Sequence, residues 1–282
     1  MKKTILLTGS SGFIGGHLAN ALKKNYKIYL TINKNRPKIK SKNVNFILYK
    51  NNLNFFRKLE KLKIDIIIHC ATFYSKHDDV KNIKNIVDSN ITFGCYLLEI
   101  SKIKKIKKFI NLTTNWENFR NKLENPKNFY ATSKLAFKKF IHYYSKTNYD
   151  TEYFSVYLSD TFGENDNRDK LFPNLKKAIK NKKKINLVSK KLYLNIINVN
   201  DLISAINILI KKKVTPGEYS VVNNKNLKLD EIINKIKNSC KLSYKFNTNS
   251  LIHDKILKLK KIKNWKPKES TLEKIKNYLL KK

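Results

Sequence analysis

Short apolar runs alternate with amphipathic stretches over the first 160 residues of the chain. The runs at 4–8 and 64–71 are apolar almost throughout, as strands buried on both faces of a sheet are. After the first run, apolar residues recur three and four positions apart, which predicts a helix. The predicted strands are 4–9, 27–33, 44–50, 64–72, 107–114 and 151–163, and the predicted helices are 13–25, 53–63, 80–104 and 130–147.

This order of elements predicts an α/β fold of the Rossmann type, in which a doubly wound parallel sheet has helices on both faces. After Gly163 the pattern loosens into polar loops, short strands and helices. We therefore predict a nucleotide-binding domain over 1–163 and a smaller substrate-binding lobe over 164–282, with some of the lobe's elements returning to the main sheet.

The formal net charge of +39 would by itself suggest nucleic acid or an anionic membrane as partner. Arginine, which grips phosphates and bases through two hydrogen bonds at once, occurs at only four positions: Arg36, Arg57, Arg120 and Arg168. The lysines are spread along the whole chain, and Asn and Ile are also abundant, as AT-rich codons produce. We attribute the charge to genome composition and expect no nucleic-acid partner.

Three cysteines, Cys70, Cys95 and Cys240, lie far apart and lack the spacing of metal ligands. They predict reduced thiols, a cytoplasmic protein and no metal site. No apolar run is long enough to span a membrane, and the glycines of the first stretch argue against a signal peptide.

The turn "TGSSGFIG" carries the strongest single motif, a G-x-x-G-x-x-G between a strand and a helix. In such a turn Gly9 permits the tight bend, Gly12 lets the backbone approach a pyrophosphate, and Gly15 permits close packing of helix on strand. Residues 9–16 hold four of the seven glycines in the chain. The turn therefore predicts a dinucleotide cofactor held at a helix N-terminus.

The end of the second strand, "LTINKNRPK", selects between the two nicotinamide cofactors. NAD-binding units place an acid there for the ribose 2′-hydroxyl. Here Lys34 and Arg36 stand in its place and suit a 2′-phosphate. NADPH is therefore the predicted cofactor, with NADH as the alternative.

The segment "YATSK" places Tyr130 and Lys134 four residues apart, on one face of a predicted helix. An ammonium group near a phenol lowers the pKa of the phenol, so we expect Tyr130 to exchange a proton near neutral pH. The preceding strand ends in Thr113 and Thr114, either of which offers a hydroxyl for the reacting oxygen.

These motifs together resemble the extended short-chain dehydrogenase/reductases that act on nucleotide sugars. The resemblance covers essentially the whole chain, through the segments "TGSSGFIGGHL", "DIIIHCAT", "DSNITFGCYLLEIS", "FINLTT", "YATSK", "NVNDLISAI" and "NWKPKESTLEKI". It implies that Thr114 binds the C4 oxygen of the sugar, with Thr113 as the alternative. It also implies that Tyr130 transfers the proton and that Lys134 binds the nicotinamide ribose. Family members form homodimers through two helices, here 88–104 and 130–147.

The resemblance also implies two sets of contacts. The cofactor-binding residues would be Gly9, Gly12, Phe13, Ile14, Gly15, Arg36, Asn52, Leu53, Cys70, Ala71, Thr72, Asn90, Tyr130, Lys134 and Leu158. The substrate-binding residues would be Thr113, Asn115, Trp116, Thr161, Arg168 and Lys170, with His77 and Asp78 as further candidates at the mouth of the site.

The residues after Thr114 narrow the reaction. The 4,6-dehydratases of this family carry Asp-Glu there, whereas this chain has Asn115 and Trp116. An amide cannot act as the acid that loss of water requires. The segment "LSDTFGENDNRDKLFPNL" resembles the branch that reduces 4-keto-6-deoxy or 3,6-dideoxy sugars on nucleotides, which includes CDP-abequose and paratose synthases and GDP-6-deoxyheptose reductases. We therefore predict a C4 ketoreductase of bacterial surface polysaccharide synthesis. The alternatives are an NAD-dependent 4-epimerase and a noncatalytic NADPH-binding protein.

Overall fold

The computed structural model describes residues 2–33, 35–75, 79–248, 250, 252–253 and 259–281. Lys34, His77 and Asp78, which we considered as ligands of cofactor or sugar, lie outside these ranges.

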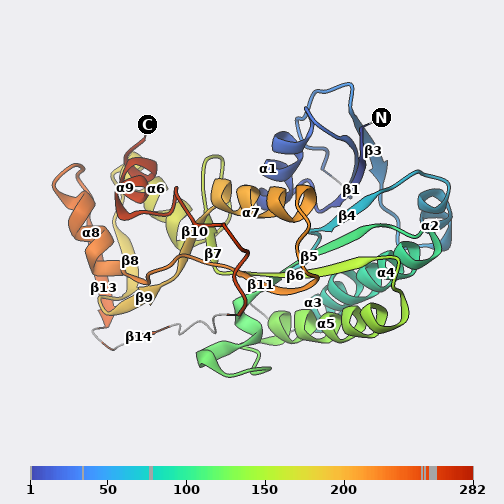
Figure 1. The fold of residues 1–282 in the computed structure, drawn as a ribbon. Helices are drawn as coiled ribbons and strands as arrows, with labels where there is room; N and C mark the ends of the chain where they lie inside the picture. Colours follow the sequence, from blue (N-terminus) through green and yellow to red (C-terminus); the bar gives the residue numbers. More distant parts are fainter. Residues whose placement is uncertain are drawn as a thin grey trace.

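Seven parallel strands form the main sheet, in the order β11-β6-β5-β4-β1-β2-β3 (Figure 1). In chain order they are β1 (Thr4–Thr8), β2 (Lys27–Ile32), β3 (Val44–Leu48), β4 (Ile66–His69), β5 (Lys108–Thr114), β6 (Glu152–Leu158) and β11 (Gly217–Val221). Every residue of β1 and β4 is buried, as their apolar sequences predict. The strand order reverses between β1 and β4, and ligands of such sheets bind where the order reverses, at the carboxyl ends of the strands. The predicted doubly wound fold is confirmed.

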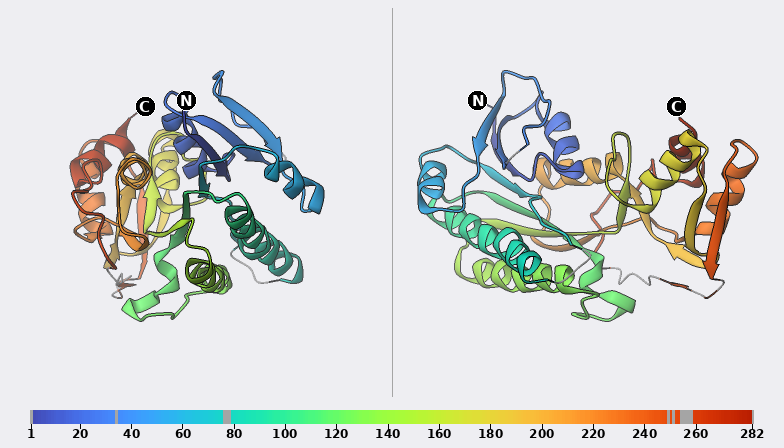
Figure 2. Two further views of the ribbon diagram at one scale, coloured as in Figure 1. Left: turned by 45° about the vertical axis from the view of Figure 1, so that its right-hand side comes forward. Right: turned by 180° about the vertical axis from the view of Figure 1, so that it is seen from behind.

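Helices cover both faces of this sheet (Figure 2). One face packs on α1 (Phe13–Leu22) and α7 (Val199–Lys211). The opposite face packs on α2 (Leu53–Glu60), α4 (Phe93–Ile103) and α5 (Phe129–Thr147). Alternate residues of each strand supply the two cores, because successive side chains of a strand point to opposite faces.

The helix predicted over 80–104 contains a change of winding. It consists of α3 (Val80–Val87), a π-helical turn (Asp88–Thr92) and α4. π-Helical turns often mark functional positions, since the extra residue turns a side chain out of the regular helical register. Here the turn carries the buried Asn90.

The second half of the chain forms a smaller body with a core of its own, at one end of the sheet in Figure 1. Its helices are α6 (Leu171–Asn181), α8 (Leu229–Lys237) and α9 (Leu272–Leu280). Its short strands pair as β7 (Asp160–Phe162) with β10 (Ile196–Asn198), β8 (Ile185–Ser189) with β13 (Tyr244–Thr248), and β9 (Leu192–Leu194) with both β12 (Leu227–Lys228) and β14 (Ile252–His253). The strand predicted over 151–163 breaks at Ser159, so that β6 stays in the main sheet while β7 enters this body. Two elements of the second half belong to the larger domain instead: β11 is an edge strand of the main sheet, and α7 packs on one face of it.

Candidate active site

The glycine turn joins β1 to α1 and lies directly against the end of β4. Gly9 has a φ of +69°, and a Cβ there would lie 2.6 Å from the backbone nitrogen of Ala71. A Cβ on Gly15 would collide with the carbonyl oxygen of Gly9. Gly12 is the N-cap of α1, and no side chain caps the helix, so its first backbone N–H groups remain open to an anion.

A cleft of about 840 Å³ extends from this turn along the carboxyl edge of the sheet. Eight of the predicted cofactor-binding residues line it, namely Gly9, Gly12, Phe13, Ile14, Gly15, Cys70, Ala71 and Thr72. It is further lined by residues that we did not predict, among them Asn33, Asn35, Tyr49, Asn51 and Asp88. A dinucleotide therefore fits the chain here on two independent grounds, the glycine cradle and the size of the cleft.

The other seven predicted cofactor residues, Arg36, Asn52, Leu53, Asn90, Tyr130, Lys134 and Leu158, do not line this cleft, and the first three have other surroundings. The guanidinium of Arg36 lies over the ring of Phe46, 4.0 Å from its centroid. The side chain of Asn52 accepts a hydrogen bond from the backbone N–H of Phe55 (3.0 Å) and caps α2. Leu53 is 61% exposed on the first turn of that helix. Asn35 and Asn51, the sequence neighbours of Arg36 and Asn52, line the cleft instead, because each loop turns its alternate side chain inward.

Asn90 braces the site from the π-helical turn. Its amide group donates to Ser133 Oγ (2.9 Å) and to the carbonyl of Phe73 (3.0 Å). Its oxygen accepts from Thr72 Oγ1 (2.9 Å) and from the backbone N–H of Phe73 (2.7 Å). All four hydrogen-bonding positions of the amide are therefore filled by protein groups. Asn90 therefore holds the loop after β4 against α5, at Ser133, the residue before Lys134.

Tyr130 and Lys134 lie in the first two turns of α5. Asn128 caps the N-terminus of this helix, since its side chain accepts from the backbone N–H of Ala131 (3.0 Å). Lys134 is 2% exposed, and its ammonium group donates to the carbonyl of Leu112 on β5 (3.2 Å). Burial lowers the pKa of Lys134 to about 8, although Glu117 and Cys70 raise it. This amine is therefore ready to change its charge near physiological pH.

The phenol of Tyr130 is different from what the sequence led us to expect. Its pKa is raised to about 12, chiefly by burial, while the Thr72 hydroxyl and Arg168 lower it. The ammonium of Lys134 is directed to a backbone carbonyl and does not offset the burial. The ring of Tyr130 packs edge to face with Tyr74 (5.3 Å between centroids) and Trp116 (6.5 Å).

The two threonines at the end of β5 point in different directions. Thr113 is buried and its hydroxyl donates to the carboxyl of Glu117. Thr114 is partly exposed, and its hydroxyl accepts from the backbone N–H of Trp116 (3.2 Å), which leaves its own proton free to point elsewhere. Thr114 pairs with Leu158 of β6, which is buried. Asn115 is also buried, and among the described residues neither atom of its amide has a hydrogen-bond partner.

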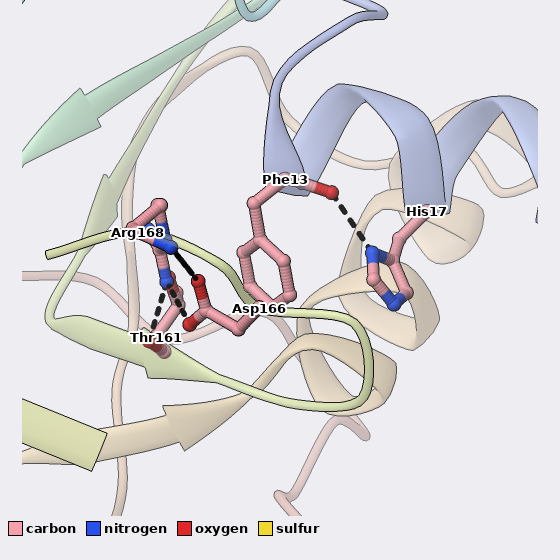
Figure 3. Close-up of polar contacts among 5 residues, drawn as sticks. All are labelled: Phe13, His17, Thr161, Asp166 and Arg168. Atoms are coloured by element: carbon pink, nitrogen blue, oxygen red, sulfur yellow. Dashed lines mark hydrogen bonds and ion pairs between the residues drawn. The ribbon is translucent and has the colours of Figure 1, made fainter. Parts of the chain in front are cut away.

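Arg168 connects the smaller body to the glycine turn (Figure 3). Its Nε donates to Asp166 Oδ1 (2.7 Å), and its Nη2 donates to Asp166 Oδ2 (2.8 Å) and to the carbonyl of Thr161 (2.7 Å). The guanidinium lies 4.2 Å from the centroid of the Phe13 ring, and the ring of His17 packs on Phe13 at 4.7 Å. Arg168 thereby lines the cofactor cleft, although the sequence placed it with the substrate.

A second, smaller cavity of about 120 Å³ adjoins the aromatic cluster. Three predicted substrate residues line it, Trp116, Thr161 and Lys170, together with Asp160, Leu171, Phe172, Pro173 and Leu194. The ammonium of Lys170 lies 4.8 Å from the Tyr74 centroid and 5.1 Å from the Trp116 centroid. This cavity therefore has a positive charge and aromatic rings on the same side.

Sequence reasoning missed Tyr74 and Glu117. Tyr74 follows a predicted strand but has no motif around it, and only the fold brings it to Tyr130. Glu117 is fully buried although it sits in the polar segment "TNWEN", so its surroundings could not be inferred from its neighbours.

Within the described part of the chain, no helix is long and apolar enough to cross a membrane, and no cluster of His, Cys, Asp and Glu could hold a metal ion.

Comparison with known proteins agrees with this geometry. Residues 5–223 match the model of the NAD dependent epimerase/dehydratase family. The chain is 28% identical over 253 residues to the dTDP-D-glucose 4,6-dehydratase of Dictyostelium discoideum, covering 77% of this chain but only 57% of that protein. It is 27% identical over 255 residues to the CDP-abequose synthase of Salmonella muenchen, covering 88% of this chain and 84% of that one.

The fold is shared with solved enzymes as well. The UDP-glucuronic acid 4-epimerase of Bacillus cereus, in complex with UDP-glucuronic acid and NAD, superimposes with a TM-score of 0.81 at 21% identity and covers 98% of both chains. The glycine turn, the cleft and the Tyr130–Lys134 pair thus stand on the scaffold that the sequence predicted. This chain belongs to the NAD dependent epimerase/dehydratase family.

Proposed function

We propose that this protein is an NADPH-dependent reductase of the C4 ketone of a nucleotide-activated 4-keto-6-deoxy or 3,6-dideoxy sugar, in the cytoplasmic synthesis of a bacterial surface polysaccharide. The observation that carries the proposal is the segment after β5. Asn115 and Trp116 stand where the dehydratases of the family carry an acid and a base. Trp116 packs against Tyr130 and lines the small cavity, so it shapes the site without supplying a proton.

In this proposal Tyr130 donates its proton to the sugar oxygen as negative charge develops there. Thr114, with a hydroxyl proton not committed to a protein acceptor in the described structure, donates a hydrogen bond to the same oxygen. The ammonium of Lys134 supplies the positive charge that stabilises the developing negative charge. When bound, the nicotinamide cofactor would supply the hydride.

The choice of NADPH rests on the end of β2. Among the described residues there, Thr31, Ile32, Asn33 and Asn35 line the cleft, and none is acidic. A ribose 2′-hydroxyl would therefore lack its usual carboxylate partner. Arg36, four residues after β2, stacks on the ring of Phe46.

The similarity to CDP-abequose synthases over most of the chain supports the reductase branch. A 4-epimerase is the second candidate, because the solved structures with this fold include 4-epimerases bound to NAD. The two reactions differ in their redox balance. A reductase consumes one NADPH for each sugar, whereas an epimerase returns the hydride and leaves its cofactor unchanged.

The experiment follows from this difference. Purified protein is mixed with NADPH and with 4-keto-6-deoxy sugars linked to CDP, GDP or dTDP, and the absorbance of the reduced nicotinamide is followed. Stoichiometric loss of that absorbance supports the reductase. A parallel assay gives the protein with NAD a 4-hydroxy nucleotide sugar: inversion at C4 with the NAD retained supports the epimerase. Cofactor binding without turnover of any sugar supports a noncatalytic protein. Tyr130→Phe should abolish turnover but keep cofactor binding, and Tyr74→Phe, which keeps the ring contact, is the matched control.

We also propose that the protein forms homodimers through α4 and α5. Four large side chains of these helices are exposed: Tyr96 (38%), Ile103 (53%), Phe140 (43%) and Tyr143 (60%). Exposed large apolar side chains on two neighbouring helices are of the kind that an interface covers. Sedimentation analysis of the wild type and of Phe140→Lys/Tyr143→Lys tests this, since a dimer should be lost in the variant.

A further inference from the structure

The buried carboxyl of Glu117 has no part in the mechanism above. Glu117 is 0% exposed and lies in the short 3-10 helix that follows β5, Asn115–Glu117. One carboxyl oxygen accepts from the Thr113 hydroxyl. The other, Oε2, is buried and has no well-aligned hydrogen-bond donor among the described residues, although the Tyr157 hydroxyl on β6 acts on the carboxyl as a hydrogen-bond partner. A carboxyl group without full hydrogen bonding is costly to bury unless nearby charge compensates it.

The charged and titratable groups around Glu117 come from three elements. Helix α5 contributes Lys134 and Lys138, which both act on the carboxyl as positive charges. Lys138 is shared with Glu124, since its ammonium lies 3.4 Å from Glu124 Oε1. Strand β6 contributes Tyr157, whose hydroxyl donates to Glu218 Oε2 on β11 (3.0 Å). Of these groups, Lys134 is the one that belongs to the proposed proton-transfer pair.

We propose that Glu117 is a positioning residue whose buried carboxylate keeps both Lys134 and Tyr130 in their protonated forms, the forms from which a ketone reductase begins its turnover. This inference rests on the proposed function in so far as Tyr130 and Lys134 are the proton-transfer pair. The geometry places the two groups at the same end of β5: Thr113 donates to the carboxyl of Glu117, and the carbonyl of the preceding residue, Leu112, accepts from the ammonium of Lys134.

The electrostatics agree in sign for both partners. Glu117 raises the pKa of Lys134, against the burial that lowers it to about 8. Glu117 also raises the pKa of Tyr130, which stands at about 12. A negative charge favours the protonated form of an amine and of a phenol alike. The pair is thereby held ready to give a proton away.

Glu117 is the described group that can supply this negative charge at neutral pH. Cys70 also lies near Lys134, but burial raises the pKa of its thiol to about 12, so it stays uncharged. The pKa of Glu117 is raised to about 7 by burial, with Thr113, Lys138, Lys134 and Tyr157 acting against that shift. Above that pH the carboxylate forms, and the charge of Lys134 is retained until about one unit higher. Each group favours the charged form of the other, since Lys134 lowers the pKa of Glu117 and Glu117 raises the pKa of Lys134.

The test is a direct titration of Lys134 that needs neither cofactor nor sugar. Protein with ¹³C-labelled lysine is followed by NMR from pH 6 to 10, where ordinary lysines with a pKa of about 10.4 scarcely titrate. The Lys134 signal is identified by its absence from Lys134→Met. In Glu117→Gln, which keeps the size and the acceptor for Thr113, the titration midpoint of Lys134 should fall by about one unit.

Glu124→Gln is the matched control. This variant removes a carboxylate that binds two other lysines of the same helix, Lys138 and Lys139. The titration midpoint of Lys134 in Glu124→Gln should equal that of the wild type. If Glu117→Gln does not fold, Glu117→Met removes the charge at similar volume, and the same fall is expected, since buried ionic groups can be replaced by apolar ones without loss of stability.

An unchanged midpoint in the Glu117 variants would overturn the inference, and so would an equal fall in Glu124→Gln or an ordinary lysine titration in the wild type. Where turnover is measurable, the alkaline limb of the activity profile should move to lower pH by the same amount as the NMR midpoint. A fall of the midpoint in a protein that turns over no keto sugar would leave the role of Glu117 intact and refute the proposed function alone.

Discussion

Replacing Arg168 tests how the smaller body contributes to the cofactor cleft. The side chain of Asp166 is 0% exposed and is held by the Nε and Nη2 groups of Arg168, whereas the Arg168 side chain is 33% exposed and faces the cleft. Arg168→Leu would therefore do two things at once. It would remove a positive charge from the cleft, and it would leave a buried carboxylate without its partner.

The two effects have different magnitudes. Breaking a buried ion pair from one side costs about 3 to 5 kcal/mol of stability, because the remaining charge stays buried. Losing a charge-assisted hydrogen bond to a ligand phosphate costs about 1.5 to 3 kcal/mol of binding, which is roughly a 10- to 150-fold rise in the dissociation constant. The double variant Asp166→Asn/Arg168→Leu removes the buried charge as well, so it should recover most of the stability but none of the binding.

Two measurements separate these effects. Thermal unfolding should show a large loss for Arg168→Leu and a much smaller loss for the double variant. Quenching of protein fluorescence by NADPH should show weaker binding in both variants to the same degree. If the double variant binds NADPH and turns over sugar as the wild type does, Arg168 contacts no phosphate of the cofactor or of the sugar nucleotide. Its only role would then be to join Asp166 to Phe13, as drawn in Figure 3.

Three further predictions concern the scaffold around the site. Gly9→Ala should abolish measurable cofactor binding, because its Cβ would lie 2.6 Å from the Ala71 nitrogen and the φ of +69° is strained for alanine; calorimetric titration that finds wild-type affinity would contradict this. Asp201→Asn should lower the free energy of unfolding by about 2 kcal/mol without changing NADPH affinity, because the 3% exposed carboxylate accepts from the backbone of 268–269 and from Ser270 Oγ, and one amide nitrogen cannot accept. His69 is buried with its pKa lowered to about 3, so the unfolded chain binds the proton first and stability should fall as the pH drops below about 6.5, by up to about 1.4 kcal/mol per unit. Urea unfolding at several pH values checks this slope, and an equal slope in His69→Gln would show that another group is responsible.

Much of the fold could be predicted because the signals are local. The buried strands of the main sheet are nearly unbroken apolar runs, and the helices between them have one apolar face, so the alternation and the parallel sheet followed from periodicity. The short strands β8, β12, β13 and β14 were not predicted. Each has two to five residues and is stabilised by a partner distant in sequence, as β13 is by β8.

The candidate site divides in the same way. The glycine turn and the Tyr130–Lys134 spacing are short-range patterns, and the structure places the turn in the cleft and both side chains on α5. Which side chain of a loop faces inward is decided by its packing, and for this reason Asn35 and Asn51 line the cleft while Arg36 and Asn52 do not. The pKa of Tyr130 also could not be inferred from its spacing to Lys134 along a helix, since burial dominates the shift and the ammonium of Lys134 is directed to the carbonyl of Leu112.

The sequence by itself determined the family, the parallel sheet and the place of the glycine turn, because each depends on residues close together in the chain. Only the tertiary structure decided what surrounds each reacting group. It brought Tyr74 to Tyr130, Arg168 to Phe13 and the carboxyl of Glu117 to the hydroxyl of Thr113. Burial and charge act through space, and they are set by chain segments that no local pattern connects.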